Sequence, residues 1–109
     1  MMGHHIFMNL YYCKNMGHLA SGSSVISLIK EVCDECNFHI VGRPVKFKRG
    51  MNVMGIVLLS ESHISIHTNN VHAYIDVFCC SGEDAAERAY DLFMSKLEPT
   101  TSTRNSCKR

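Results

Sequence analysis

Residues 53–80 read VMGIVLLSESHISIHTNNVHAYIDVFCC, and this stretch decides the fold of the chain. Three runs rich in apolar and β-branched residues lie at 53–59, 61–68 and 73–80, with short polar stretches between them. Runs of this composition and length predict three strands in succession. Because strands joined by tight turns pair antiparallel, the centre of the fold is expected to be an antiparallel sheet.

Alternation along residues 61–68 sorts the side chains onto two faces of the strand. One face carries Glu61, His63, Ser65 and His67, and the other carries Ser62, Ile64, Ile66 and Thr68. Taken alone, the pattern is typical of a strand with one wet face. A metal site at His63 and His67 lacks a third ligand at suitable spacing. A serine hydrolase lacks the glycines that flank such a nucleophile.

Two further strands are predicted outside this stretch, at residues 5–12 and 38–47. The histidines His4 and His5 are expected to belong to a frayed end. Residues 14–23 contain glycines and serines and predict a loop.

Two amphipathic helices complete the pattern. Apolar residues recur at helical spacing over 25–36, where Ser23 or Ser24 is a suitable cap. The second helix is predicted to follow Ser81 and to run to Leu97, with acidic residues favourable in its first turn.

The order of elements is strand, helix, several strands, helix. It predicts an α+β fold: a two-layer sandwich in which two helices pack on one face of an antiparallel sheet. Residues 1–97 are expected to form a single domain. Residues 98–109 are polar and basic, and they predict a flexible tail.

Composition narrows the class of protein. Of the 109 residues 46% are hydrophobic and 19% are charged, which is typical of a folded domain rather than a disordered one. The net charge of +1 gives no general attraction to nucleic acid or membranes, and no apolar run approaches the roughly 18 residues of a membrane span. The start lacks a basic segment followed by an apolar one, so a cytoplasmic location is expected.

Six cysteines are present, and several lie within apolar periodic segments. Reduced thiols are therefore expected. Cys33 and Cys36 form a CxxC motif, which occurs in redox proteins, but no second CxxC supports a redox function. Without disulfides a chain of this size gains from oligomerisation, and a homodimer is expected.

The segment Glu61–Thr68, ESHISIHT, resembles the cleavage-site motif of bacterial and archaeal S-adenosylmethionine decarboxylase proenzymes. Residues 76–80, DVFCC, resemble the second motif of that family. The resemblance covers most of residues 4–97 and the order of strands and helices.

The resemblance implies a self-processing, pyruvoyl-dependent decarboxylase of S-adenosylmethionine, acting in spermidine biosynthesis. The hydroxyl of Ser62 attacks the carbonyl of Glu61, and elimination leaves a β chain of residues 1–61. The α chain, residues 62–109, then begins with the pyruvoyl group. That group is the covalent cofactor and the electron sink for decarboxylation of a small-molecule substrate. No metal is implied.

The resemblance also assigns roles to individual residues. Ser62 is the pyruvoyl precursor, and Glu61 supplies the scissile carbonyl. His67 matches the histidine that assists processing, and Cys80 matches the cysteine that donates a proton in the reaction. Two substrate-binding positions match Phe47 and Ile64; for Phe47 an ordinary core aromatic is the other interpretation. The neighbouring Cys79 is expected in the core.

One geometric requirement accompanies these roles. In a regular strand Ser62 and His67 have opposite parity and face opposite sides. For both to serve one site, the chain must bend or bulge between them, or the cleaved end must move.

Two departures from the family pattern keep alternatives open. Met54 stands where the family has Ser or Thr, and Asn69-Asn70-Val71 follow Thr68 where the family has a Trp-Pro-Glu segment whose glutamate contacts the nucleoside. The altered segment favours, as one alternative, a pyruvoyl-dependent decarboxylase of ornithine or arginine on the same scaffold. The other alternative is an uncleaved, non-catalytic regulatory partner.

Overall fold

The run at residues 53–80 forms the centre of a six-stranded sheet in the computed structural model, which describes residues 3–109. Its three strands are β3 (Asn52–Leu59), β4 (Ser62–Asn69) and β5 (His72–Cys79), joined by two-residue turns. Both pairs are antiparallel, with Leu59 opposite Ser62 and Asn69 opposite His72. Residues 1 and 2, which are predicted to belong to the domain, lie outside the described residues.

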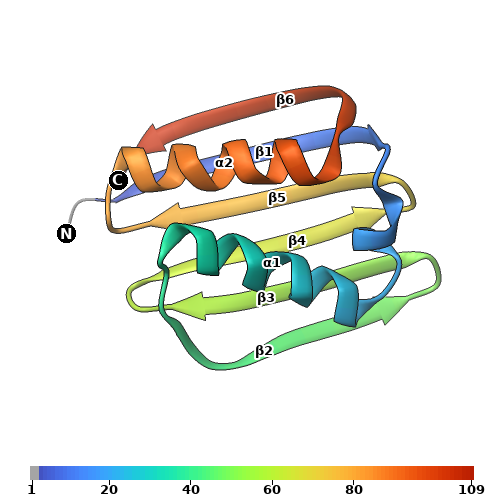
Figure 1. Ribbon diagram of the computed structural model, residues 1–109, viewed down its shortest axis with the longest axis horizontal. Coiled ribbons are helices and arrows are strands. Elements are labelled where there is room, and N and C mark those ends of the chain that lie inside the picture. The colour runs from blue at the N-terminus through green and yellow to red at the C-terminus, as the bar shows by residue number, and fades with distance from the viewer. Residues whose placement is uncertain (1–2) are drawn as a thin grey trace.

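The other strands extend this centre on both sides, in the order β2-β3-β4-β5-β1-β6 (Figure 1). Every pair is antiparallel. These strands are β1 (His4–Cys13), β2 (Ile40–Arg49) and β6 (Pro99–Lys108). β1 begins at His4, so the histidines that the sequence assigned to a frayed end are paired with β5.

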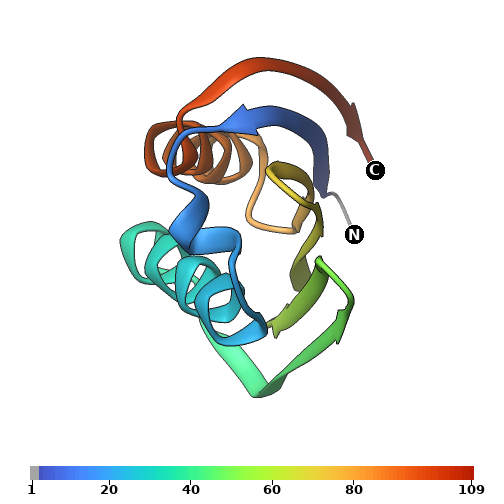
Figure 2. The same ribbon diagram turned by 90° about the vertical axis from the view of Figure 1, so that its right-hand side faces the viewer.

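Both helices, α1 (Gly22–Cys36) and α2 (Glu83–Leu97), lie on the same side of the sheet (Figure 2). The α+β two-layer sandwich predicted from the sequence is therefore confirmed. The opposite side of the sheet is not covered by either helix and is called the open face below.

The helix starts differ slightly from the prediction. α1 is capped by Ser21, whose hydroxyl accepts a hydrogen bond from the backbone N–H of Ser24 (3.1 Å), while the Ser24 hydroxyl accepts from the N–H of Ser21 (2.9 Å). This reciprocal capping box starts the helix earlier than the predicted caps would. α2 is preceded by Gly82 at φ 110° rather than by a capping serine, because the turn there needs a conformation open to glycine. The loop predicted at 14–23 contains one short 3-10 helix, Met16–Leu19.

The core lies between the sheet and the helices. Even-numbered residues of β1 and β4 and odd-numbered residues of β3 and β5 point into it. Gly55 lets α1 approach β3 closely, since a Cβ there would lie 2.9 Å from Val25 Cγ1 and 3.0 Å from Ile26 Cδ1.

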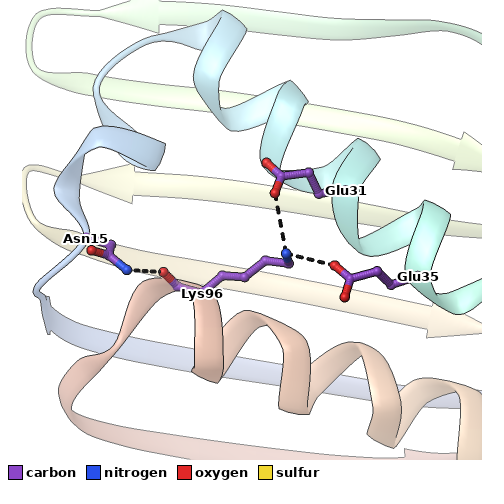
Figure 3. Close-up of polar contacts among 4 residues, drawn as sticks. All are labelled: Asn15, Glu31, Glu35 and Lys96. Atoms are coloured by element: carbon purple, nitrogen blue, oxygen red, sulfur yellow. Dashed lines mark hydrogen bonds and ion pairs between the residues drawn. The ribbon is translucent and has the colours of Figure 1, made fainter.

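A polar clamp joins the two helices at their exposed side (Figure 3). Lys96 Nζ of α2 lies 2.7 Å from Glu35 Oε2 and 3.4 Å from Glu31 Oε1 of α1. The amide of Asn15 donates to the carbonyl oxygen of Lys96 (2.7 Å), so the loop before α1 is attached to the end of α2.

The C-terminal segment is a strand, not the flexible tail that the sequence predicted. Residues 99–108 form β6 and pair with β1 in continuous register from Cys13–Pro99 to His4–Lys108. The segment has almost no apolar residues, so hydrophobic periodicity gives no signal. Its backbone groups instead pair with the otherwise unpaired edge of β1, and its threonines suit a strand.

Two other expectations concern cysteines and membranes. All six cysteines are free thiols, as predicted, and Cys79 is buried in the core. Within residues 3–109, no helix has the length and apolar character needed to cross a membrane.

Candidate active site

The predicted cleavage site lies in the tight turn between β3 and β4. Ser60 and Glu61 are the two turn residues, and Ser62 is the first residue of β4. Glu61 has φ 61°, in the left-handed region that residues with a side chain seldom adopt. The carbonyl proposed for attack therefore belongs to a residue held in a sparsely populated conformation, which is a common feature of functional sites.

The turn after β5 contacts this cleavage turn. The backbone N–H of Cys80 donates to Ser62 Oγ (2.9 Å), and the Cys80 thiol donates to the carbonyl oxygen of Ser60 (3.6 Å). Eighteen residues separate Ser62 from Cys80 in the sequence. The antiparallel pairing of β4 with β5 brings the two together, because Phe78 and His63 are opposite each other near these strand ends.

A cavity of about 600 Å³, called the Ser62 pocket here, opens at this end of the sheet. Its lining includes Glu61, Ser62 and His63. Phe78 and Arg109 also line it, with the Arg109 guanidinium 5.3 Å from the centre of the Phe78 ring.

Sequence reasoning missed Arg109. The basic tail gave no signal for a site, because only the pairing of β6 with β1 carries residue 109 back to Gly3, which exchanges two backbone hydrogen bonds with it. In the Ser62 pocket Arg109 supplies a guanidinium, a group suited to a substrate carboxylate.

A second cavity, of about 460 Å³, lies on the open face and is called the open-face pocket. His67 and Phe47 both line it. Phe47 is 60% exposed, so it is not the ordinary core aromatic that was the other interpretation. Met54 pairs with both residues across β3, with Phe47 on β2 and His67 on β4. The thioether of Met54 has no hydrogen-bond donor to offer His67.

Ile64 occupies a different environment from Phe47. It is fully buried on the helix side of β4 and lines neither the Ser62 pocket nor the open-face pocket. The even parity that the sequence assigned to Ile64 places it among core residues.

Ser62 and His67 are not brought together within one protomer. They lie five residue steps apart along a regular strand, which is about 16 Å at roughly 3.3 Å per residue. β4 pairs with β3 and β5 without a register shift from residue 63 to 67, so no bulge turns His67 toward Ser62. The bend required for a shared site in one protomer is absent from β4.

The alternative readings of the sequence receive no support from this geometry. His63 and His67 lie four residues apart along a regular strand, about 13 Å, too far to hold one metal ion. Within residues 3–109, the hydrogen bond found for Ser62 Oγ comes from Cys80 and none comes from a histidine.

The CxxC cysteines are also poorly suited to redox chemistry. Burial raises the pKa of the Cys33 thiol to about 12. Burial likewise raises the pKa of Cys36, although nearby Arg88 opposes this increase. Thiolate is the reactive form of cysteine, so both thiols are expected to be inert at neutral pH.

Comparison with known proteins adds the family. The family model described as S-adenosylmethionine decarboxylase matches residues 4–109. An S-adenosylmethionine decarboxylase proenzyme of Archaeoglobus fulgidus is 36% identical over 100 residues, covering 90% of this chain and 88% of the relative. An arginine decarboxylase proenzyme of Ignicoccus hospitalis is 34% identical, covering 99% of this chain and 81% of the relative.

A solved structure is also similar. The crystal structure of the adenosylmethionine decarboxylase from Aquifex aeolicus matches with a TM-score of 0.89 at 25% identity. The match covers 99% of this chain and 90% of that one.

Proposed function

We propose that this chain, which belongs to the S-adenosylmethionine decarboxylase family, cuts itself between Glu61 and Ser62 and decarboxylates S-adenosylmethionine for spermidine synthesis. Members of the family depend on a pyruvoyl group made from one of their own serines. The observation that carries the proposal is the hydrogen bond from the backbone N–H of Cys80 to Ser62 Oγ (2.9 Å). This hydrogen bond joins the second motif of the sequence to the cleavage-site motif.

Self-processing requires only atoms of this turn and water. Ser62 Oγ attacks the carbonyl carbon of Glu61, and the amide nitrogen of Ser62 leaves, which turns the amide into an ester. Loss of the Ser62 Cα proton then breaks the Cβ–O bond. The Glu61 carboxylate is released, and residue 62 becomes dehydroalanine. Water enters and ammonia departs, so residue 62 ends as a pyruvoyl group.

The residues around Ser62 fit such a group. The hydrogen bond from Cys80 holds the side chain at the mouth of a cavity large enough for a small ligand, and the left-handed Glu61 lies next to it. The group supplies the electron sink on which loss of carbon dioxide depends. Cys80 is the proposed proton donor, since its thiol contacts the Ser60 carbonyl oxygen of the cleavage turn, and Arg109 offers a cation to the substrate carboxylate.

His67 and Phe47 act from a different place. We assign His67 to assistance of processing and Phe47 to stacking on the substrate base, as the family motif implies. Ile64 is assigned to substrate binding by the same motif, and its burial limits it to shaping the site from the core. The separation of His67 from Ser62 in one protomer needs an explanation, which a dimer provides.

The open face supports a homodimer. Its exposed apolar side chains lie mainly on β2 and β3: Val45, Phe47, Met54, Ile56 and Leu58. A contiguous apolar surface of this kind marks an interface. If two open faces pack about a two-fold axis perpendicular to the strands, the Ser62 end of each β4 lies over the far end of its partner, where His67 is.

A second substrate class is favoured by one specific feature. β4 and β5 are joined by the two-residue turn Asn70-Val71, with Asn70 at φ 60°, so the chain has no loop there to carry the nucleoside-binding glutamate of the family. Arginine or ornithine is therefore the alternative substrate. A relative of similar identity bears the name arginine decarboxylase proenzyme.

Intact mass under denaturing conditions tests cleavage. The wild type is expected to give two chains split between Glu61 and Ser62, whose masses sum to the full chain plus water less ammonia. Ser62→Ala is expected to stay whole. A single wild-type chain that behaves like Ser62→Ala overturns the proposal and favours the uncleaved partner.

Carbon dioxide release from labelled substrates tests specificity. Turnover of S-adenosylmethionine without turnover of arginine or ornithine supports the main proposal. The reverse result replaces its substrate with a basic amino acid.

Mixing two variants, one unable to cut itself and one slow to do so, tests the shared site. Ser62→Ala lacks the nucleophile, and His67→Ala lacks the helper histidine. In a mixed dimer one site regains both groups, so cleavage of the His67→Ala chain is expected to speed up on mixing. No change in its cleavage rate, with exchange of protomers verified, contradicts a site shared between protomers.

A further inference from the structure

A buried histidine lies at the start of β1 without a partner. His4 is 9% exposed, and its Nε2 has no hydrogen bond to any of residues 3–109. The parity of β1 places it on the helix side, in line with Ile6 and Met8 of the core. A buried imidazole nitrogen without a partner is costly, so its presence calls for an explanation.

Two carboxylates of α2 meet this histidine. Glu83 and Glu87 are four residues apart, and therefore share one face of the first turns of the helix. One ring nitrogen of His4 and one carboxylate oxygen from each glutamate all lie within 4.8 Å of one another. The cluster lies on the helix side of the sheet, and the open-face pocket lies on the other side.

Arg104 of β6 holds one of the two carboxylates in place. Its Nη1 and Nη2 donate to the two oxygens of Glu87 at 2.8 and 2.5 Å. This bidentate pair fixes the orientation of the Glu87 carboxylate. Each carboxylate oxygen has a second lone pair that remains available, and orienting partners of this kind are typical behind metal ligands.

We propose that His4, Glu83 and Glu87 bind a divalent transition-metal ion of the Zn²⁺ type. One imidazole nitrogen and two carboxylate oxygens form a ligand set that zinc accepts, with a water in the fourth position. Zinc bonds of about 2.0–2.2 Å bring ligand atoms to about 3.3 Å from one another. Glu83 is exposed, so its side chain has room to rotate toward the other two ligands.

The site has a structural consequence that rests on the proposed self-cleavage. His4 belongs to the β chain, residues 1–61, whereas both glutamates belong to the α chain, residues 62–109. The ion therefore links the two products of cleavage. His4 also pairs with Cys79, next to Cys80, so the link lies close to the turn that holds Ser62.

Calorimetric titration with Zn²⁺ tests the site. The full chain carrying Ser62→Ala is used beside the wild type, so that binding is read whether or not cleavage occurs. We expect one ion per chain, and at least tenfold weaker binding in His4→Gln and in Glu83→Gln. The matched controls are Asp84→Asn, which removes a charge from the same helical turn, and His18→Gln in the 3-10 helix Met16–Leu19 beyond the other end of β1. Both are expected to bind within twofold of the parent.

Two outcomes overturn the proposal. One is the absence of Zn²⁺ binding. The other is binding that His4→Gln and Glu83→Gln leave unchanged, which assigns the ion to other groups such as the exposed Cys107. Because Glu83 is exposed, Glu83→Gln keeps the test valid if His4→Gln fails to fold. An uncut wild type that binds Zn²⁺ at these residues removes only the link between chains, and leaves the site itself intact.

Discussion

The two faces of β4 differ in almost every physical respect. On the helix side Ile64, Ile66 and Thr68 are at most 1% exposed and lie within one continuous core. On the open face His63, Ser65 and His67 carry polar groups beside a cavity or at its rim. The same eight residues therefore supply both stability and chemistry.

Substitutions on the two faces of β4 are therefore expected to act on different properties of the protein. The helix side is dry and closely packed, so volume and hydrogen bonding are fixed there. The open face exposes apolar groups that a second copy can cover. Substitutions on the helix side are expected to change folding at every protein concentration, and those on the open face are expected to change assembly and catalysis.

The pair of variants Phe93→Ala and Phe47→Ala tests the difference between the two faces most directly. Phe93 is fully buried beneath the sheet, and its truncation is expected to cost about 3–5 kcal/mol of unfolding free energy. Phe47 is exposed, so its truncation costs little in a free protomer, within about 0.5 kcal/mol. Urea unfolding at several protein concentrations measures both.

The same two variants also test the dimer, through the dependence of their stability on protein concentration. If open faces pair, the cost of Phe47→Ala grows as the protein is concentrated, while that of Phe93→Ala stays constant. Equal behaviour of Phe47→Ala at all concentrations would argue against a dimer through the open face.

Gly55→Ala tests the close approach of α1 to β3. The added methyl meets Val25 and Ile26 at 2.9 and 3.0 Å, so the helix must shift, at an expected cost of about 1–3 kcal/mol. Gly17→Ala is the control, because a Cβ there has no neighbour within 4 Å. Thermal unfolding of both variants reads the difference, and equal melting temperatures would show that α1 moves freely.

Thr68→Val isolates one buried hydrogen bond on the helix side. The Thr68 hydroxyl accepts from the backbone N–H of Val53 (2.8 Å), where β3 begins. Valine keeps the shape but leaves this N–H without an acceptor, at an expected cost of about 1–2 kcal/mol. The exposed Thr101→Val is the control, and chemical denaturation is the measurement. A neutral Thr68→Val would mean that water replaces the hydroxyl.

Lys96→Met removes the cation of the polar clamp between α1 and α2, and it has the smallest expected effect. The pKa of Lys96 is raised, chiefly by its hydrogen bond to Glu35. Stability from this shift is fully present below the ordinary lysine value of about 10.4, and is lost as pH rises through the folded value. Since the glutamates are half exposed, solvent screening limits the contribution to about 0.2–1 kcal/mol.

Unfolding of Lys96→Met at neutral and at strongly alkaline pH checks this sign. The difference from wild type should shrink at the higher pH. The exposed Lys30→Met is expected to show no such change, and a cost that persists in alkali would point to lost packing of the lysine stem instead.

Much of this fold is contained in local pattern. Alternation correctly assigned the side chains of residues 63–68 to their faces, and the helical spacing at 25–36 located α1 to within a few residues. The tail was wrong because β6 lacks an apolar period and is stabilised by pairing with β1. Hydrogen bonds between the backbones of two strands do not depend on apolar side chains, so the hydropathy pattern does not reveal them.

The two motifs, the resemblance to the family and the opposite parity of Ser62 and His67 could all be read from the amino-acid sequence alone. This is so because period, turn residues and motif spacing are local properties of a chain. Only the tertiary structure decided that Cys80 donates to Ser62, that Arg109 returns to the Ser62 pocket, and that His4 meets Glu83 and Glu87. These contacts join residues distant in the chain, and strand register and helix packing alone set which distant residues meet.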